Sequence, residues 1–246
     1  MVSWESDLAA RLDPVEFARS ALGFEADARQ AEVLRSGAKR LLLNCTRQWG
    51  KSTVTAIAAL HRASFQPGSL VLVTGPSEQQ AAEFVRKVRD FVSLLGVRPR
   101  GDGQNKSVVL PNGSRIVGVP SKQSTVRGFS NASLLIIDEA AHASDQLYLA
   151  MRPVLAVSGG DLWCLSTPNG KRGFFWDAWT KQGEAWTRIS VPATECARIP
   201  AAFLEEERQT QPDSWFRQEY LCEFVQDFEG LFDMDLVDAA FEDYSG

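Results

Sequence analysis

The chain has 246 residues, of which 44% are hydrophobic and 23% are charged, and its formal net charge is −5. This balance predicts one large α/β domain with a sizeable core, and no apolar run approaches the roughly 20 residues that a membrane span needs. The four cysteines lie far apart and there are only two histidines, so we expect no zinc site and a reducing compartment.

The first half of the chain alternates helical patterns with short apolar runs. Asp13 followed by Pro14 predicts a capped helix start, and Gly23 predicts its end. The elements expected in this half are helices at 14–22, 28–35, 51–65 and 77–95, strands at 40–44 and 70–74, and a β-hairpin at 108–119 whose turn is Asn112-Gly113.

The second half begins with a polar loop at 120–133 and continues the alternation. The expected strands are 134–137, 162–165 and 186–191, and the expected helices are 145–157, 174–179, 201–209 and 214–224. Strands that alternate with helices, and that are apolar on both faces, predict a doubly wound, mainly parallel sheet with ligands at the carboxyl ends of its strands.

The strongest local signal is the stretch Thr46-Arg47-Gln48-Trp49-Gly50-Lys51-Ser52-Thr53, which joins a strand to a helix. Unpaired backbone N–H groups at such a helix start bind phosphate, and Gly50 lets the loop close around it. We expect Lys51 to reach the β- and γ-phosphates and Ser52 to bind Mg²⁺. Cys45 replaces the first glycine of the usual G-x-x-x-x-G-K-[ST] pattern.

Two acids follow the apolar strand at 134–137. Asp138 suits the metal side of a nucleotide site, and Glu139 suits polarisation of an attacking water. Arg47 places a guanidinium within the phosphate loop itself. That guanidinium either offsets transition-state charge in cis or shapes the loop through backbone carbonyls, and the sequence leaves both roles open.

In combination, these motifs resemble the ATPase domain of the large terminase subunit, the DNA-packaging motor of tailed bacteriophages. The similarity covers about residues 20–230. It rests on 46–52 as a deviant phosphate loop, 136–142 as the acidic motif, Ser166-Thr167-Pro168 as the coupling motif, and 216–224 as the stretch that closes the ATPase region. The resemblance implies a P-loop NTPase of the ASCE/RecA-like class with a core at 1–190, a small lid subdomain at 191–230, and a linker start at 231–246.

The resemblance also implies roles that spacing alone does not give. Gln30 corresponds to an adenine-reading glutamine, since an amide can pair with both edges of adenine. Arg127 lies in a loop that supplies an arginine to a neighbouring subunit in some family members. Arg127 in trans and Arg47 in cis are therefore competing candidates for the arginine finger. Ser166 and Thr167 would sense the γ-phosphate through water.

A basic stretch begins within the helix expected at 77–95 and continues beyond it. Residues 86–127 contain nine Lys or Arg and two Asp, whereas residues 195–246 contain three Arg and fourteen acids. Basic side chains that contact phosphates without reading sequence suit a processive motor on double-stranded DNA. The candidate DNA-binding residues are Arg86, Lys87, Arg89, Arg98, Arg100, Lys106 and Lys122.

The expected activity is ATP hydrolysis with Mg²⁺, coupled to the movement of double-stranded viral DNA into the procapsid. The implied partners are the portal protein, the small terminase subunit and further copies in a ring, expected to be a pentamer. The implied location is the host cytoplasm, transiently at the procapsid portal, with no membrane partner. We expect no nuclease activity, because the acids at 227–243 are not spaced as a metal cluster.

Two other classes of protein share parts of this pattern. A helicase or repair ATPase shares the glutamine, the phosphate loop and the acidic pair, but it needs a second RecA-like domain for which the residues after Ser144 are too few. A nucleotide-gated docking module without turnover would not need the complete set of lysine, metal ligands and base.

Overall fold

The computed structural model describes residues 4–99, 106–120, 128–181 and 185–226. Its centre is a seven-stranded sheet in the order β3-β4-β2-β5-β6-β1-β7. Paired neighbours are parallel except β3 and β4, which form the predicted antiparallel hairpin. The strands are β1 (Arg40–Cys45), β2 (Leu70–Thr74), β3 (Ser107–Val109), β4 (Arg115–Gly118), β5 (Leu134–Asp138), β6 (Asp161–Ser166) and β7 (Thr187–Val191).

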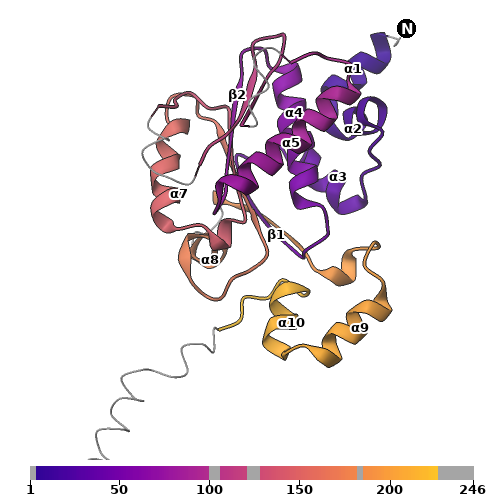
Figure 1. Cartoon of the computed structure of the whole chain (residues 1–246), viewed down its shortest axis with the longest axis vertical. Coiled ribbons are helices and arrows are strands. Elements are labelled where there is room, and N and C mark those ends of the chain that lie inside the picture. Colours follow the sequence, from indigo (N-terminus) through magenta and orange to yellow (C-terminus); the bar gives the residue numbers. More distant parts are fainter. Residues whose placement is uncertain (1–3, 100–105, 121–127, 182–184, 227–246) are drawn as a thin grey trace, which may run out of the picture.

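Helices cover both faces of the sheet. The five helices α1 to α5 lie on one side and α7 and α8 lie on the other, as Figure 1 shows. Their bounds are α1 (Trp4–Leu12), α2 (Pro14–Leu22), α3 (Ala28–Arg35), α4 (Lys51–Phe65), α5 (Glu78–Leu94), α7 (Asp145–Met151) and α8 (Gly173–Thr180). The last two helices, α9 (Ala201–Thr210) and α10 (Asp213–Glu219), lie beyond one end of the sheet.

The core consists of two layers because successive side chains of a strand point to opposite faces. Leu41 and Leu43 of β1 pack into the layer beneath α2 to α5, whereas Leu42 packs into the layer beneath α7 and α8. All three leucines are fully buried. The sheet is therefore covered on both faces, which confirms the predicted doubly wound, mainly parallel arrangement.

Some element limits differ from expectation. The helix expected at 145–157 ends at Met151 and continues as the short 3-10 helix η2 (Arg152–Leu155), because Pro153 cannot donate the hydrogen bond that an α-helix needs. The helix expected at 214–224 ends at Glu219, and Cys222 has a φ of 59°. Helix α1 was not expected, since its large apolar residues form only one narrow row, Trp4, Leu8 and Leu12.

The parallel strands bring distant segments to one edge of the sheet. β6 lies between β5 and β1, and all three run in the same direction. Glu139 follows β5, Thr167 follows β6 and Thr46 follows β1. The acidic motif, the coupling motif and the phosphate loop therefore meet at this edge. Within the described residues, no helix has the length and apolar character that a bilayer crossing demands.

The proposed division at 190 and 230 remains a prediction. In the structure, β7 is followed by the short 3-10 helix η4 (Ala193–Glu195) and by the helices α9 and α10. The linker predicted at 231–246 lies outside the described residues.

Candidate functional site

The phosphate loop is a tight turn between β1 and α4. Gln48 and Gly50 both have left-handed backbones, with φ of 63° and 95°. Only glycine adopts such a conformation without strain, which explains Gly50 directly before the helix. Helix α4 starts at Lys51, and Gly50 provides no side-chain cap. The first N–H groups of α4 are thus available to an anion.

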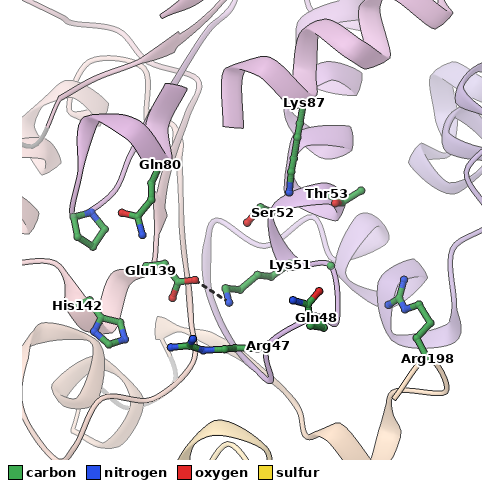
Figure 2. A pocket seen from close by; sticks show the side chains of 12 residues that line it. Arg47, Gln48, Lys51, Ser52, Thr53, Gln80, Lys87, Glu139, His142 and Arg198 are labelled. Carbon is green, nitrogen blue, oxygen red and sulfur yellow. Dashed lines mark ion pairs between the residues drawn. The ribbon is translucent and has the colours of Figure 1, made fainter. Parts of the chain in front are cut away.

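Lys51 and Glu139 form an ion pair at the centre of this turn. Lys51 Nζ lies 2.9 Å from Glu139 Oε1, and both side chains are largely buried (Figure 2). Burial alone would lower the pKa of Lys51, but the neighbouring carboxylate of Glu139 raises it overall. Glu139 itself has a left-handed backbone with φ of 50° at the point where the chain leaves β5.

Ser52 and Asp138 form the second contact between the loop and the acidic motif. The Ser52 hydroxyl donates to Asp138 Oδ2 at 2.9 Å. Burial, together with the charge of Glu139, raises the pKa of Asp138 above its ordinary value. A hydroxyl beside a carboxylate suits Mg²⁺, which prefers oxygen ligands and usually binds through one or two protein groups plus phosphates and water. The donor set therefore fits the metal that the sequence implies.

A cavity of about 780 Å³ opens over this cluster (Figure 2). Its size is in the range of small-molecule sites. The predicted residues that line it are Arg47, Gln48, Gly50, Lys51, Ser52, Thr53 and Glu139. A second cavity of about 510 Å³ adjoins it on the side of Asp138. The two halves of the nucleotide-site prediction, although about 90 residues apart, face one space.

Three predicted nucleotide-binding side chains do not line the cavity. Gln30 is buried, accepts from the Asp27 N–H at 3.1 Å and donates to the Trp49 carbonyl at 3.1 Å. Trp49 is fully buried in the core layer beneath α2 to α5. The Thr46 hydroxyl donates to the Glu219 carbonyl at 2.9 Å. These contacts shape the loop. Because the side chains of Thr46 and Trp49 are engaged within the protein, only their backbone groups can contribute to a phosphate site.

The coupling motif lies beside the acidic motif. The Ser166 hydroxyl contacts Glu139 Oε2 at 3.4 Å, which is a long hydrogen bond. Thr167 and Pro168, the next two residues in the chain, are buried. Arg127, the candidate finger in trans, lies outside the described residues.

Five residues of the cavity lining were not predicted as nucleotide contacts. Arg198 donates to the Trp49 carbonyl and lies 3.3 Å from Asp27, so it closes the side of the loop near Gly50. Lys87 reaches from α5 toward Ser52 (Figure 2). The other three are Pro76, Gln80 and His142. No spacing rule links these positions to the loop, because only the folded chain brings α5 and the segment after β7 to it.

The candidate DNA-binding residues are partly engaged within the chain. Arg86 pairs with Glu83 at 2.5 Å, and Lys106 pairs with Glu78 at 3.2 Å. Arg89 donates to the Ser107 carbonyl at 2.9 Å. Arg98 is exposed. Lys87 faces the cavity as described, and the remaining two candidates, Arg100 and Lys122, lie outside the described residues.

Comparison with known proteins places this chain in a family. The family model described as "Terminase large subunit, T4likevirus-type, N-terminal" matches residues 42–238. The large terminase subunit of Thermus phage G20c is 26% identical over 259 aligned positions, which cover 90% of this chain and 53% of that protein. The large terminase subunit of Escherichia phage T5 is 26% identical over 196 positions, covering 76% of this chain and 44% of that protein.

Solved structures show the same fold. The ATPase domain of the Thermus phage P74-26 large terminase superposes with a TM-score of 0.76 at 23% identity, over 87% of this chain and 99% of that chain. The large terminase of another thermophilic bacteriophage, solved in complex with ADP, gives a TM-score of 0.68 at 13% identity, over 85% of this chain and 56% of that chain. These likenesses confirm the predicted α/β P-loop NTPase fold.

The chain spans about half the length of the curated relatives it matches. The family model covers most of the chain, including the phosphate loop, the acidic motif and the coupling motif. The chain therefore belongs to the T4likevirus-type large terminase subunit family, of which it carries the N-terminal region.

Proposed function

We propose that this chain is an ATP-hydrolysing motor domain that moves double-stranded viral DNA into the procapsid. The observation that carries the proposal is the convergence of Lys51, Ser52 and Glu139 on one cavity, with Asp138 bonded to Ser52 and lining the adjoining cavity. A phosphate cradle, a cation, a pair of metal ligands and a carboxylate base are the components that phosphoryl transfer to water requires. Family membership supports the same conclusion, and one of the large terminases with this fold binds ADP in its solved structure.

In this mechanism, the N–H groups at the start of α4 and the Lys51 ammonium bind the β- and γ-phosphates. Phosphate oxygens would compete with Glu139 for the Lys51 ammonium, since Lys51 Nζ lies 2.9 Å from Glu139 Oε1 in this structure. Glu139, released from that ion pair, would orient water and accept its proton. Ser52 and Asp138 would hold Mg²⁺, which supplies neutralisation of phosphate charge when bound.

The arginine that offsets transition-state charge is Arg47 in this proposal. Arg47 lines the cavity, and its guanidinium points across the cavity floor toward Glu139 and His142 (Figure 2). Arg127 in trans remains the competing candidate. Mixing a Lys51→Ala subunit with an Arg127→Ala subunit separates the two, because a finger in trans should partly restore turnover at some mixing ratio, whereas Arg47 in cis should not.

The partners follow from the family. We propose that the domain works in a ring of identical subunits, expected to be a pentamer, with the portal protein and the small terminase subunit at the procapsid in the host cytoplasm. The basic side chains of the β3–β4 edge and α5 would contact DNA phosphates. Ser166, next to Glu139, would report the loss of the γ-phosphate to the segment after β6.

Steady-state ATP turnover tests the proposal. Glu139→Gln should lower kcat by about 10²- to 10⁴-fold, the contribution of a general base, while nucleotide binding persists. Lys51→Ala should lower both binding and turnover. The matched control is Glu206→Gln on the exposed face of α9, which should leave turnover unchanged. Hydrolysis that survives both Glu139→Gln and Lys51→Ala would refute the assignment.

A further inference from the structure

The C-terminal segment is fastened to the phosphate loop and to β1. The Thr46 hydroxyl donates to the Glu219 carbonyl at 2.9 Å, and the Asn44 side-chain amide donates to the Cys222 carbonyl at 2.8 Å. The Ala193 N–H donates to the Tyr220 carbonyl at 2.7 Å. All three contacts come from residues around the end of α10. The loop therefore rests on a segment about 170 residues further along the chain.

Within this segment, Glu219 is a buried acid. The residue is 5% exposed, and its Oε2 lies 2.6 Å from Nε of Arg47. An ionised carboxylate is costly to bury unless a partner neutralises it, and losing one partner of such a pair is strongly destabilising. Arg47 is the cation that serves this purpose, although its own side chain is 62% exposed at the cavity.

The shortest contact of this ion pair is made by Nε, the guanidinium nitrogen nearest the backbone. The contact is electrostatic, since Glu219 Oε2 has no hydrogen-bond partner among the described residues, and no other described carboxylate pairs with Arg47. The two terminal nitrogens project into the cavity toward Glu139 and His142 (Figure 2). A guanidinium held at Nε can still present two parallel donors to phosphate oxygens.

We propose that Glu219 is the positioning residue of Arg47, holding its terminal nitrogens ready for the γ-phosphoryl group. This inference rests on the proposed function and deepens it, because it makes the closing stretch of the domain part of the hydrolysis site. An exposed arginine without such an anchor would sample many rotamers and be misplaced for much of the time. Misplacement by about 1 Å can cost about 100-fold in rate.

The opposite role for the same contact is sequestration, in which Glu219 keeps Arg47 away from the nucleotide. The two roles predict opposite signs. Removing a positioning carboxylate lowers kcat, whereas removing a sequestering one raises it. The direction in which the terminal nitrogens point favours positioning.

The test compares ATP turnover of Glu219→Gln with that of Glu223→Gln in the full chain. Glu223 lies on the same segment and pairs with Arg217 at the surface, so it is a matched control. Glu219→Gln should lower kcat by about 10- to 100-fold with little change in KM, because the side chain acts on the transition state through Arg47. Glu223→Gln should leave both constants unchanged.

A double-mutant cycle shows whether the effect passes through Arg47. Once Arg47→Ala has removed the guanidinium, adding Glu219→Gln should cause no further loss of kcat. If Glu219→Gln unfolds the protein, ATP turnover of the Arg47→Lys variant is measured instead. An ammonium can neutralise Glu219 but, while paired there, cannot present further donors to phosphate, so kcat should fall while the melting temperature is kept.

Three results would overturn the inference: an increase in kcat for Glu219→Gln, an equal loss for Glu223→Gln, or a full further loss in the Arg47→Ala background. Unchanged turnover in a folded Arg47→Lys variant would do the same. Failure of the proposed function is a separate outcome, recognised by wild-type turnover that Lys51→Ala does not reduce, and it would remove the inference as well.

Discussion

Gln30 offers a sharp test of how the loop is held, because its side chain faces the protein rather than the cavity. Its amide oxygen accepts from the Asp27 N–H and completes the capping box of α3, while its amide nitrogen donates to the Trp49 carbonyl. Both ends of the amide that would read adenine are therefore engaged. We predict that Gln30→Leu, which keeps the bulk and removes both hydrogen bonds, destabilises the nucleotide-free protein.

The expected loss is about 2 kcal/mol, since each hydrogen bond contributes about 1 kcal/mol net. A larger penalty is not expected, because Arg198 still donates to the Trp49 carbonyl and keeps that oxygen from being unpaired. For a domain of this length, 1 kcal/mol shifts the melting temperature by about 2–4 °C, so a decrease of about 4–8 °C should be seen by calorimetry. Gln209→Leu on the exposed face of α9 is the control and should shift it by little.

Nucleotide preference gives the second readout of the same variant. If Gln30 only supports the loop, Gln30→Leu should weaken ATP and GTP to the same extent. If Gln30 reads adenine, the variant should lose its preference for ATP over GTP. An unchanged melting temperature combined with lost discrimination would refute the structural role inferred from the contacts.

Three further predictions follow from other contacts. Asp13 caps α2 through the Val15 N–H and pairs with Arg35 at 2.6 Å, so Asp13→Ala should cost about 1 kcal/mol in urea titrations at pH 7. The hydrogen bond from Arg35 lowers the pKa of Asp13 in the folded protein, so the ionised carboxylate stabilises the fold above its ordinary pKa of 3.8. The stability difference between the wild type and Asp13→Ala should therefore shrink as the pH falls below about 3.8, and a difference at pH 3 equal to that at pH 7 would contradict this. Arg198→Ala should raise the KM for ATP by about tenfold, about 1.4 kcal/mol of binding, with kcat retained, since Arg198 closes the loop side of the cavity; an unchanged KM would remove it from the site. Raising salt from about 50 to 200 mM should weaken DNA binding by about tenfold or more, because two phosphate contacts are enough for a decrease of that size. An affinity that does not change with salt would exclude the basic surface from DNA binding.

Most of the fold was predictable because its signals are local. The strand at 134–138 is apolar on both faces, and the start of α2 is marked by a cap and a proline. The misplaced limits arise where a backbone detail decides, as with Pro153 in η2 and the left-handed Cys222 after α10. Helix α1 was missed because Trp4, Leu8 and Leu12, although at helical spacing, form a single narrow apolar row that is a weak signal by itself.

The candidate site was predictable only where motif residues carry it. Two separate motifs assign Lys51 and Glu139 to one nucleotide site, and the structure brings the two side chains to 2.9 Å. Arg198 and Lys87 could not be found in this way, because they reach the cavity from elements whose positions depend on the whole sheet. Lys87 had been grouped with the DNA-binding residues on charge alone, since sequence does not show which face of α5 it occupies.

The phosphate loop is held from both outer parts of the chain, and this has a consequence for coupling. Gln30, before β1, and Arg198, after β7, both donate to the carbonyl of Trp49, while Glu219 contacts Thr46 and Arg47. These contacts are made by residues of α3, α10 and the segment after β7, and none of them by a strand of the sheet. A nucleotide that moves the loop must therefore strain or release α3 and the segment from Ala193 to Cys222. Because the arrangement of packed elements changes in discrete steps rather than continuously, such a contact set can convert a small shift at the phosphates into a larger movement of α9 and α10.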